Sequence, residues 1–379
     1  MRVATSVGTA ALLASMFSTS AQAQEPASGT RAKRWYKGNT HTHTLNTDGD
    51  SAPDDVVRYY REHKYHFLVL SDHDIVTSVD ALNGIFALGE RSASDRPGVP
   101  LNPFLLIPGE ELTDSWSPRG GATAGRDLER KEIHLTALNV KKAVAPQKGA
   151  SVAETIQRDV DAIRAAGGVP IVNHPNFVWS VTAGDLRPLR NARLFELFNG
   201  HRQTHFLGGG GAPGVEALWD ELLSAGTLLY GVAADDSHFF KGSEGPAAMS
   251  APGRGWVMVR AERLDAEAIL QALERGDFYA TTGVELAEYS ANEKGISLRV
   301  VPFSRSRYQV QFIGKGGRVL KEVGVQPSLD ASPAGGALVP KAETASYEFQ
   351  GDEGYVRARV IESNGAMAWT QPALVPQRP

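Results

Sequence analysis

The sequence predicts an α/β fold, a parallel barrel or doubly wound sheet of about 250 residues followed by a small antiparallel β domain. Two observations predict it. As far as about residue 286, short apolar runs alternate with amphipathic helical patterns, as in parallel sheets with helices on their faces. Beyond that point the runs alternate apolar and polar residues between Gly and Pro, which is typical of antiparallel sheets with one solvated face.

The strands of the first region are predicted from apolar runs, which a sheet buried on both faces requires. They cover residues 67–70, 104–107, 133–140, 169–172, 194–198, 228–232 and 256–259. One helix is expected from Pro53, and another from a capping box at Ser151 and Glu154 to Gly167. Two more are expected over residues 215–224 and 266–275, and the strands of the β domain over residues 296–301, 308–312, 347–349 and 355–361.

Composition excludes several classes of protein. With 42% hydrophobic and 22% charged residues among 379, the chain has ordinary globular usage and is not disordered. The formal charge of −4 leaves no basic excess for binding nucleic acid or an anionic membrane by bulk charge. There are no cysteines, so any metal site must use His, Asp and Glu. The ten histidines are therefore the residues to follow.

The first residues resemble an export signal. Arg2 precedes an apolar run over residues 3–17, and Ala21-Gln22-Ala23 fits the small-x-small cleavage rule. We expect a signal peptide over residues 1–23, cleavage near Ala23, a flexible lead-in over residues 24–34, and a periplasmic or secreted protein. A buried N-terminal helix is the alternative. No segment approaches the 18 apolar residues of a membrane span.

Histidines and carboxylates recur after the predicted strands. The first cluster is Thr40-His41-Thr42-His43 with Asp48, and His-x-His in extended backbone points both imidazoles to one face. Later strands end in Ser71-Asp72-His73-Asp74, Gly109-Glu110-Glu111, Asn173-His174-Pro175 and Asp235-Asp236-Ser237-His238. The carboxyl ends of barrel strands are where α/β barrels build their sites. His134 lies inside a strand pattern, where a buried histidine needs a partner such as a metal.

Such a cluster suits a hydrolase. His and carboxylate ligands without thiolates fit Zn²⁺, Mn²⁺ or Fe²⁺. Two metals about 3.5–4 Å apart can generate hydroxide near neutral pH and clamp both oxygens of an in-line displacement at phosphorus. A Lewis-acid metal could equally polarise a carbamate or ester carbonyl, so the cluster does not choose between them. No Gly-x-Ser-x-Gly elbow is present, which disfavours a serine hydrolase.

The order HTH…D…SDHD…PGEEL…EIHL…NHPN…DDSH over about residues 35–285 resembles the PHP (polymerase and histidinol phosphatase) family of metal-dependent hydrolases. The segment GDFYATTG resembles the closing segment of that family. The DDSH variant and the tail motif Ala368-Trp369-Thr370-Gln371-Pro372 resemble the CehA/McbA-type branch, some of whose members are described as carbamate hydrolases. The resemblance implies a distorted (β/α)7 barrel over residues 35–286 and a β domain over residues 287–379.

The resemblance also implies two or three divalent metal ions (Zn, Mn or Fe) and their ligands. Glu111 would bridge the first two ions, and its choice over Glu110 follows the family pattern Gly-x-Glu-apolar-Thr. Some relatives have His at the position of Asp48, a ligand of the third ion. By motif matching the first ion takes His41, His43, Glu111 and Asp236, the second Glu111, His134 and His174, and the third Asp48, His73 and His238.

Further polar and aromatic residues are candidates for binding substrate. His201, Arg202 and His205 follow the strand predicted over residues 194–198 and would lie on the same rim as the ligands. Arg202 could bind a substrate anion and one histidine could protonate a leaving group, whereas a solvated polar loop is the alternative. Three tryptophans, Trp116, Trp179 and Trp219, could line an aromatic pocket, with packing as their default role.

The sequence therefore predicts an exported hydrolase that uses a metal-activated hydroxide on a small-molecule substrate. Phosphoester hydrolysis, of a mono- or diester of a small organic phosphate, is the first hypothesis. Hydrolysis of a carbamate or aryl ester on the same metals is the second. The third is a non-catalytic, metal-stabilised binding protein. The physiological substrate, the identity of the metals and the oligomeric state stay open.

Overall fold

The computed structural model describes most of the chain between residues 32 and 376. The described ranges are 32–84, 103–118, 129–242, 249–303, 306–326, 328–330, 339–341 and 344–376. The predicted signal peptide and residues 24–31 of the predicted lead-in lie outside them. Among the helices of these ranges, none combines the length and the apolar character that crossing a membrane requires.

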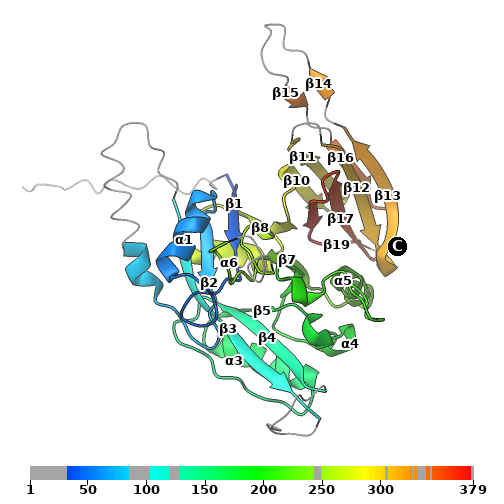
Figure 1. Ribbon diagram of the computed structural model, residues 1–379. Coiled ribbons are helices and arrows are strands. Elements are labelled where there is room, and N and C mark those ends of the chain that lie inside the picture. The colour runs from blue at the N-terminus through cyan, green and yellow to red at the C-terminus, as the bar shows by residue number, and fades with distance from the viewer. Residues whose placement is uncertain are drawn as a thin grey trace, which may run out of the picture. The chain divides into compact units, whose positions relative to one another are not determined.

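The first region contains both helices and strands, and helices separate most of its strands along the chain (Figure 1). The strands are β1 (Arg34–Asn39), β2 (Phe67–Leu70), β3 (Leu105–Trp116), β4 (Lys131–Leu138), β5 (Val169–Val172), β6 (Leu194–Asn199), β7 (Tyr230–Ala234), β8 (Trp256–Ala261) and β9 (Phe278–Thr281). The helices are α1 (Pro53–Glu62), α3 (Val152–Ala165), α4 (Ala183–Leu186), α5 (Val215–Ser224) and α6 (Ala266–Glu274), with short 3-10 turns η1 (Phe177–Trp179) and η2 (Arg202–Thr204).

Strands dominate the second region. They are β10 (Leu286–Asn292), β11 (Gly295–Val300), β12 (Tyr308–Gly314), β13 (Arg318–Val325), β14 (Ser328–Asp330), β15 (Val339–Lys341), β16 (Thr344–Glu348), β17 (Tyr355–Glu362), β18 (Met367–Thr370) and β19 (Ala373–Leu374), with the 3-10 turn η4 (Lys315–Gly317) between β12 and β13. The fold is therefore mixed α/β followed by antiparallel strands, as the sequence predicts.

The first region is built on a sheet in the order β9-β8-β1-β2-β3-β4-β5-β6-β7. β1, β2 and β3 pair in parallel, and so do β5, β6 and β7. β4 runs antiparallel to both β3 and β5, and β8 runs antiparallel to β1 and β9. The expectation of a parallel sheet is thus wrong at β4 and β8, which run against their neighbours, because apolar runs report burial and not strand direction.

The sheet closes on itself at the carboxyl ends of its parallel strands. The chain after β7 meets the chain after β1 through a parallel bridge between Thr42 and Ser237. The Asp236 N–H donates to the His41 carbonyl at 3.0 Å, and the His43 N–H donates to the Ser237 carbonyl at 2.9 Å. Backbone pairing therefore joins two segments nearly 200 residues apart and completes a barrel at the end where the predicted ligands lie.

β3 extends well beyond the strand predicted over residues 104–107. It pairs with β2 only as far as Pro108, and from Gly109 to Trp116 its partner is β4. Glu111 therefore lies inside β3, and the prediction that it follows the end of a strand is wrong. It still reaches the carboxyl edge of the barrel, because a parallel bridge sets Glu111 beside His73, past the end of β2.

The helix predictions agree with the structure. α1 begins at Pro53 and has Asp54 and Asp55 in its first turn. The positive end of the helix dipole stabilises the negative charges of these two carboxylates. The Ser151 side chain caps α3 by accepting from the Glu154 N–H. α5 covers the predicted residues, and α6 ends one residue earlier than predicted.

The strands after Leu286 form a second core. The outer part of the main sheet, in the order β13-β12-β17-β18, continues to β9, and β10, β11 and β16 form a separate antiparallel sheet. Side chains from both sheets share one buried apolar cluster, which includes Leu298, Phe312 and Val360. β9 and β18 pair directly, so one sheet continues from the first region into the second. The domain boundary between residues 286 and 287 therefore stays a prediction.

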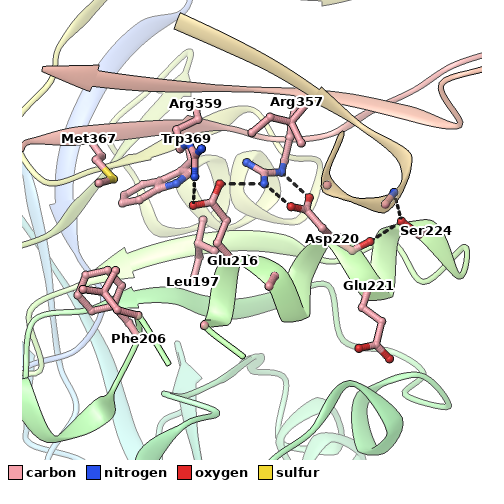
Figure 2. Close-up of a pocket in the computed structure, with 16 residues that line it drawn as sticks. Leu197, Phe206, Glu216, Asp220, Glu221, Ser224, Arg357, Arg359, Met367 and Trp369 are labelled. Atoms are coloured by element: carbon pink, nitrogen blue, oxygen red, sulfur yellow. Dashed lines mark hydrogen bonds and ion pairs between the residues drawn. The ribbon is translucent and has the colours of Figure 1, made fainter. Parts of the chain in front are cut away.

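A buried ionic network links α5 to β17 (Figure 2). The fully buried Arg357 guanidinium donates to both Asp220 oxygens, at 2.8 and 2.7 Å, and also contacts Glu216 at 2.8 Å. Tyr355 donates its hydroxyl to Asp220 at 2.7 Å. Because breaking a buried ion pair leaves an uncompensated charge, this network fixes where β17 packs against α5.

A buried carboxyl on α3 should make stability depend on pH. Burial raises the pKa of Asp159 to about 7, against a hydrogen bond from the Gln147 N–H and with help from the nearby charge of Asp114. In the unfolded chain the same group titrates near pH 4. The folded state thus binds the proton more tightly, and the stabilisation present at low pH is lost as the pH rises through 7.

Urea unfolding of the parent and of Asp159→Asn at pH 5 and pH 8 tests this pH dependence. The asparagine keeps an acceptor for the Gln147 N–H and does not titrate. The free energy of unfolding of the parent, relative to the variant, should fall by about 2 kcal/mol between these pH values. A constant difference between the two proteins would contradict the assignment.

Candidate metal centre

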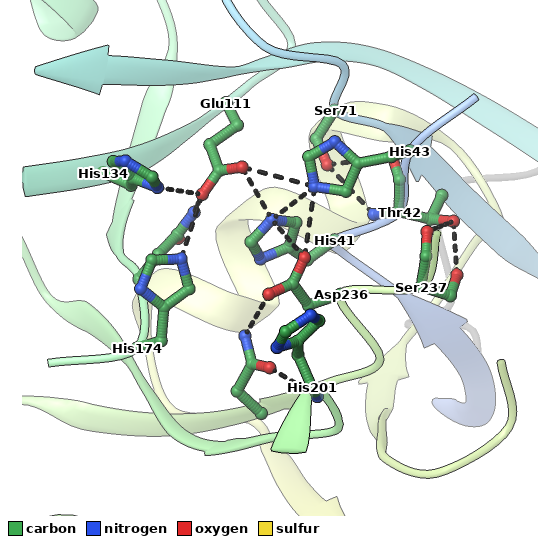
Figure 3. Close-up of polar contacts among 12 residues, drawn as sticks. His41, Thr42, His43, Ser71, Glu111, His134, His174, His201, Asp236 and Ser237 are labelled. Atoms are coloured by element: carbon green, nitrogen blue, oxygen red, sulfur yellow. Dashed lines mark hydrogen bonds and ion pairs between the residues drawn. The ribbon is translucent and has the colours of Figure 1, made fainter. Parts of the chain in front are cut away.

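The structure brings the nine predicted ligands together at the carboxyl end of the barrel. Figure 3 shows His41, His43, Glu111, His134, His174 and Asp236 of this set. They come from segments that follow β1, β2, β5 and β7 and from the interiors of β3 and β4. The described residues include four groups whose ligand atoms all lie within 4.8 Å of one another: His43, Asp48, His73 and His238; His41, Glu111 and His174; His41, His43 and Asp236; and His73, Glu111 and His134.

The innermost group contains two imidazoles and two carboxylates. The Nε2 atoms of His41 and His43 lie 3.1 Å apart. Oε2 of Glu111 lies 3.2 and 3.3 Å from these two nitrogens, and Oδ1 of Asp236 lies 3.3 and 3.1 Å from them. Four ligand atoms from three distant parts of the sequence therefore face one point.

Glu111 faces two groups of histidines with its two oxygens. Oε2 faces His41 and His43, whereas Oε1 lies 3.1 Å from Nδ1 of His134 and 3.1 Å from Nε2 of His174. A carboxylate shared in this way has the arrangement of a bridge between two cations. This is the role that the family resemblance implies for Glu111.

A third group lies on the open side of the cluster. Nδ1 of His43 faces Oδ1 of Asp48 at 3.4 Å, and Oδ2 of Asp48 lies 3.5 Å from His73 and 3.3 Å from His238. The Asp48 side chain is 52% exposed, whereas His41 and His43 are fully buried. The cluster is therefore open to solvent on the side of Asp48.

The residues fit divalent metal ions. Ligand atoms about 2.1 Å from a tetrahedral zinc ion lie roughly 3.4 Å from one another, close to the 3.1–3.3 Å separations of the inner group. Nδ1 of His43 is buried and has no hydrogen-bond partner among the described residues. Buried histidines and carboxylates of this kind are stable only when their charges and lone pairs are satisfied, and a cation satisfies both.

The titration behaviour of the cluster shows the same preference for positive charge. Burial opposes the charged form of His43, but hydrogen bonds and attraction from Asp236 and Glu111 outweigh it and raise its pKa to about 9. The pKa of His41 is raised in the same way. Burial likewise opposes ionisation of Glu111 and Asp236, and the surrounding histidines still hold their pKa values well below the usual range. The field of the carboxylates thus attracts cations.

Sequence reasoning missed Glu196, a buried carboxylate inside β6. Its Oε1 lies 2.7 Å from Nδ1 of His41, and its Oε2 accepts from the His174 N–H at 2.9 Å and from Asn199 at 2.8 Å. Pairing Nδ1 with a carboxylate leaves Nε2 of His41 directed at the cluster. The feature of the sequence that could have pointed to Glu196 is its place as a single glutamate in the apolar run over residues 194–198.

Two neutral side chains also support the ligands without having been predicted. Asn173 donates to Oε1 of Glu111 at 2.9 Å, and its carbonyl oxygen accepts from the Thr136 N–H at 3.1 Å. The Thr113 hydroxyl lies 2.7 Å from Nδ1 of His73. Both restrict the orientation of a predicted ligand, as partners of metal-binding residues commonly do.

The aspartates next to the ligands in the sequence accept hydrogen bonds that fix the neighbouring segments of the chain. Asp72 accepts from the Thr44 N–H and from threonine hydroxyls that follow the His-x-His motif. Asp235 accepts from the backbone N–H groups of residues 253–255 and from the Tyr60 hydroxyl. Asp74 accepts from the Thr113 N–H. These contacts position the segments that carry the ligands.

Of the three predicted substrate residues, His201 lies nearest the cluster. Its ring centre is 5.5 Å from that of His238, and its Nδ1 accepts from the Gln203 N–H at 3.3 Å. Arg202 is exposed, and its backbone N–H donates to the Met249 carbonyl. His205 is exposed and stacks on Trp179. The structure thus separates the three, and a contact of Arg202 or His205 with substrate stays a prediction.

Comparisons with known proteins give structural matches only. No family model and no curated protein matches the sequence. One match is a two-domain protein from Bacteroides vulgatus described as containing a predicted PHP-like metal-dependent phosphoesterase, with 14% identity, a TM-score of 0.44, and coverage of 90% of this chain and 96% of that one.

Two further matches cover 56% of this chain at 15% identity. One is a candidate metal-dependent phosphoesterase from Bifidobacterium adolescentis, with 91% of that chain covered and a TM-score of 0.34. The other is an amidohydrolase from Chromobacterium violaceum with bound sulfate and no metal, with 89% of that chain covered and a TM-score of 0.32. Matches this distant assign no activity or substrate to this chain.

The contact between Glu196 and His41 predicts a measurable effect on metal affinity. Glu196→Gln removes the charge that orients His41 and should weaken binding of Zn²⁺ or Mn²⁺ by about 10- to 100-fold. Competition with a chelator of known affinity measures it. The matched control is Glu293→Gln, which alters an exposed glutamate in the turn between β10 and β11. Equal affinities for the two variants would show that Glu196 does not orient a ligand.

Proposed function

We propose that the chain is a metal-dependent hydrolase of the PHP type, and a phosphoesterase acting on a mono- or diester of a small organic phosphate. The observation that carries the proposal is the buried Glu111 carboxylate, whose two oxygens face two separate groups of histidines. A centre of this kind suits phosphoester hydrolysis, in which stabilising negative charge is most of the catalytic task.

The ligand assignment follows the three groups. His41, His43 and Asp236 would hold one ion, His134 and His174 a second, and Asp48, His73 and His238 a third, with Glu111 shared between the first two. When bound, such ions supply Lewis-acid polarisation of a substrate oxygen and activation of water as the nucleophile.

The residues of the chain have distinct tasks around that centre. Glu196 and Asn173 orient His41 and Glu111 through their hydrogen bonds. The buried side of the cluster excludes water, so polar interactions there are stronger than in solution. His201 accepts at Nδ1, which leaves its proton on Nε2, and from its place beside His238 it can donate that proton to a leaving oxygen.

Carbamate or aryl-ester hydrolysis on the same centre is the second candidate. The DDSH segment and the tail motif support it through their resemblance to the CehA/McbA-type branch. Export also belongs to the proposal: residues 1–23 would direct the chain to the periplasm or the exterior and would be cleaved near Ala23. A phosphoester or carbamate of low molecular weight is a suitable substrate for an enzyme in either the periplasm or the exterior.

A substrate panel tests the function. The mature protein with added Zn²⁺ or Mn²⁺ should hydrolyse p-nitrophenyl phosphate or bis-p-nitrophenyl phosphate, and an aryl N-methylcarbamate more slowly. His41→Ala should lower turnover about a hundredfold or more, because it removes a ligand from the inner group. The matched control is His63→Ala, since His63 is exposed at the end of α1 and should leave turnover unchanged.

Two outcomes would contradict the proposal. Turnover of the carbamate without turnover of either phosphoester would replace the first candidate with the second. Full activity in His41→Ala would show that hydrolysis does not depend on the centre at all.

A further inference from the structure

Two neighbouring loops on the rim of the centre carry a stacked pair of rings. Trp179 lies in the loop that follows β5 and His205 in the loop that follows β6. Their ring centres are 4.8 Å apart and their planes differ by 13°. Neither ring belongs to the four groups of candidate metal ligands, and His205 is exposed.

The backbone that presents this pair is strained. Val178 has φ 44° and ψ 27°, inside the turn η1, and Trp179 and His205 have φ of 57° and 48°. Left-handed backbone is disfavoured for residues with side chains, and most of all for a β-branched residue such as Val178. Strain of this kind persists only where surrounding contacts enforce it, and it clusters at functional sites.

Hydrogen bonds enforce the strained arrangement. The buried Asn176 amide donates to the His205 carbonyl at 3.1 Å and to the Pro213 carbonyl at 2.9 Å, which ties the two loops together. Lys131 donates its Nζ to the Trp179 carbonyl at 2.9 Å. The pair is thus positioned by hydrogen bonds to the main chain of both loops.

A glycine-rich segment lies beside the indole. Gly208 to Gly211 all have positive φ, and a Cβ on Gly209 would lie 3.7 Å from Cη2 of Trp179. A Cβ on Gly210 or Gly211 would meet nothing within 4 Å. Gly209 therefore borders the ring with backbone alone, and the glycines after it leave open space.

Apolar side chains flank the pair and are exposed. Val178 is 46% exposed and Leu207 is 75% exposed, on the two loops that carry the rings. By contrast, Trp219 is fully buried and donates its Nε1 to the Leu229 carbonyl, and Trp116 packs against the barrel core. Of the three tryptophans considered as pocket residues, Trp179 is the one that stacks on an exposed histidine.

Sequence neighbours of the pair on both loops lie beside the predicted metal ligands. Phe177, two residues before Trp179, has its ring centre 5.3 Å from that of His174 and 6.0 Å from that of His134. On the other loop His201, four residues before His205, lies beside His238. A substrate held at the centre by its reacting group can therefore extend over these two loops.

We propose that Trp179 and His205, flanked by Val178 and Leu207, form an aromatic shelf that binds a flat apolar group of the substrate. The inference rests on the proposed function and narrows its substrate class to esters whose organic part is aromatic. Such a group would stack on the pair and bury the exposed apolar side chains, and both interactions favour binding.

Binding of two phosphonates tests the shelf without requiring turnover. Phenylphosphonate and methylphosphonate carry the same anionic group and differ in the flat apolar part. Titration calorimetry with the Mn²⁺-loaded protein should show tighter binding of phenylphosphonate. Trp179→Ala should weaken that binding about tenfold and leave methylphosphonate within about twofold, whereas Trp179→Phe should retain most of the difference.

The control is Phe303→Ala, which removes an exposed aromatic side chain far along the chain and should not change either affinity. Equal weakening of both phosphonates by Trp179→Ala, or no preference for the phenyl compound in the parent, would overturn the shelf. Unchanged turnover and unchanged phosphonate binding in His41→Ala would instead contradict the proposed function, so the two failures are distinguishable.

Discussion

The backbone pairing that closes the barrel is the constraint on which the rest of the site depends. The Asp236 N–H bonds to the His41 carbonyl and the His43 N–H to the Ser237 carbonyl, so the segments after β1 and β7 are fixed against each other. These segments carry both histidines of the His-x-His motif and one carboxylate of the inner group. With the barrel open at this point, the inner ligands would have no common centre.

The closed barrel then holds an unusual concentration of buried polar groups. Glu111, Asp236 and Glu196 are nearly inaccessible to solvent, and each is surrounded by imidazole nitrogens or amide donors. Buried carboxylates are stable only with such partners, and the histidines need the carboxylates equally. The arrangement therefore serves a cation, while Asn173 and Glu196 fix the directions of the ligands before any ion binds.

Much of this site could be predicted from the sequence, because His and carboxylate residues at short spacing after apolar runs form a pattern that the sequence shows directly. The direction of β4 and the extension of β3 could not, since both depend on pairing between residues 109–116 and 131–138, and apolar runs report burial alone. Glu196 was hidden for a similar reason: one polar residue in an apolar run has no local partner, and His41 lies 155 residues away.

Metal content and position test the central claim most directly. The mature protein would be saturated with Zn²⁺ or Mn²⁺, freed of excess ion, analysed for metal per chain and crystallised for anomalous diffraction. We expect two or three ions per chain, with one anomalous peak beside each oxygen of Glu111. A protein that retains no stoichiometric ion, or whose ions lie away from Glu111, would contradict the account.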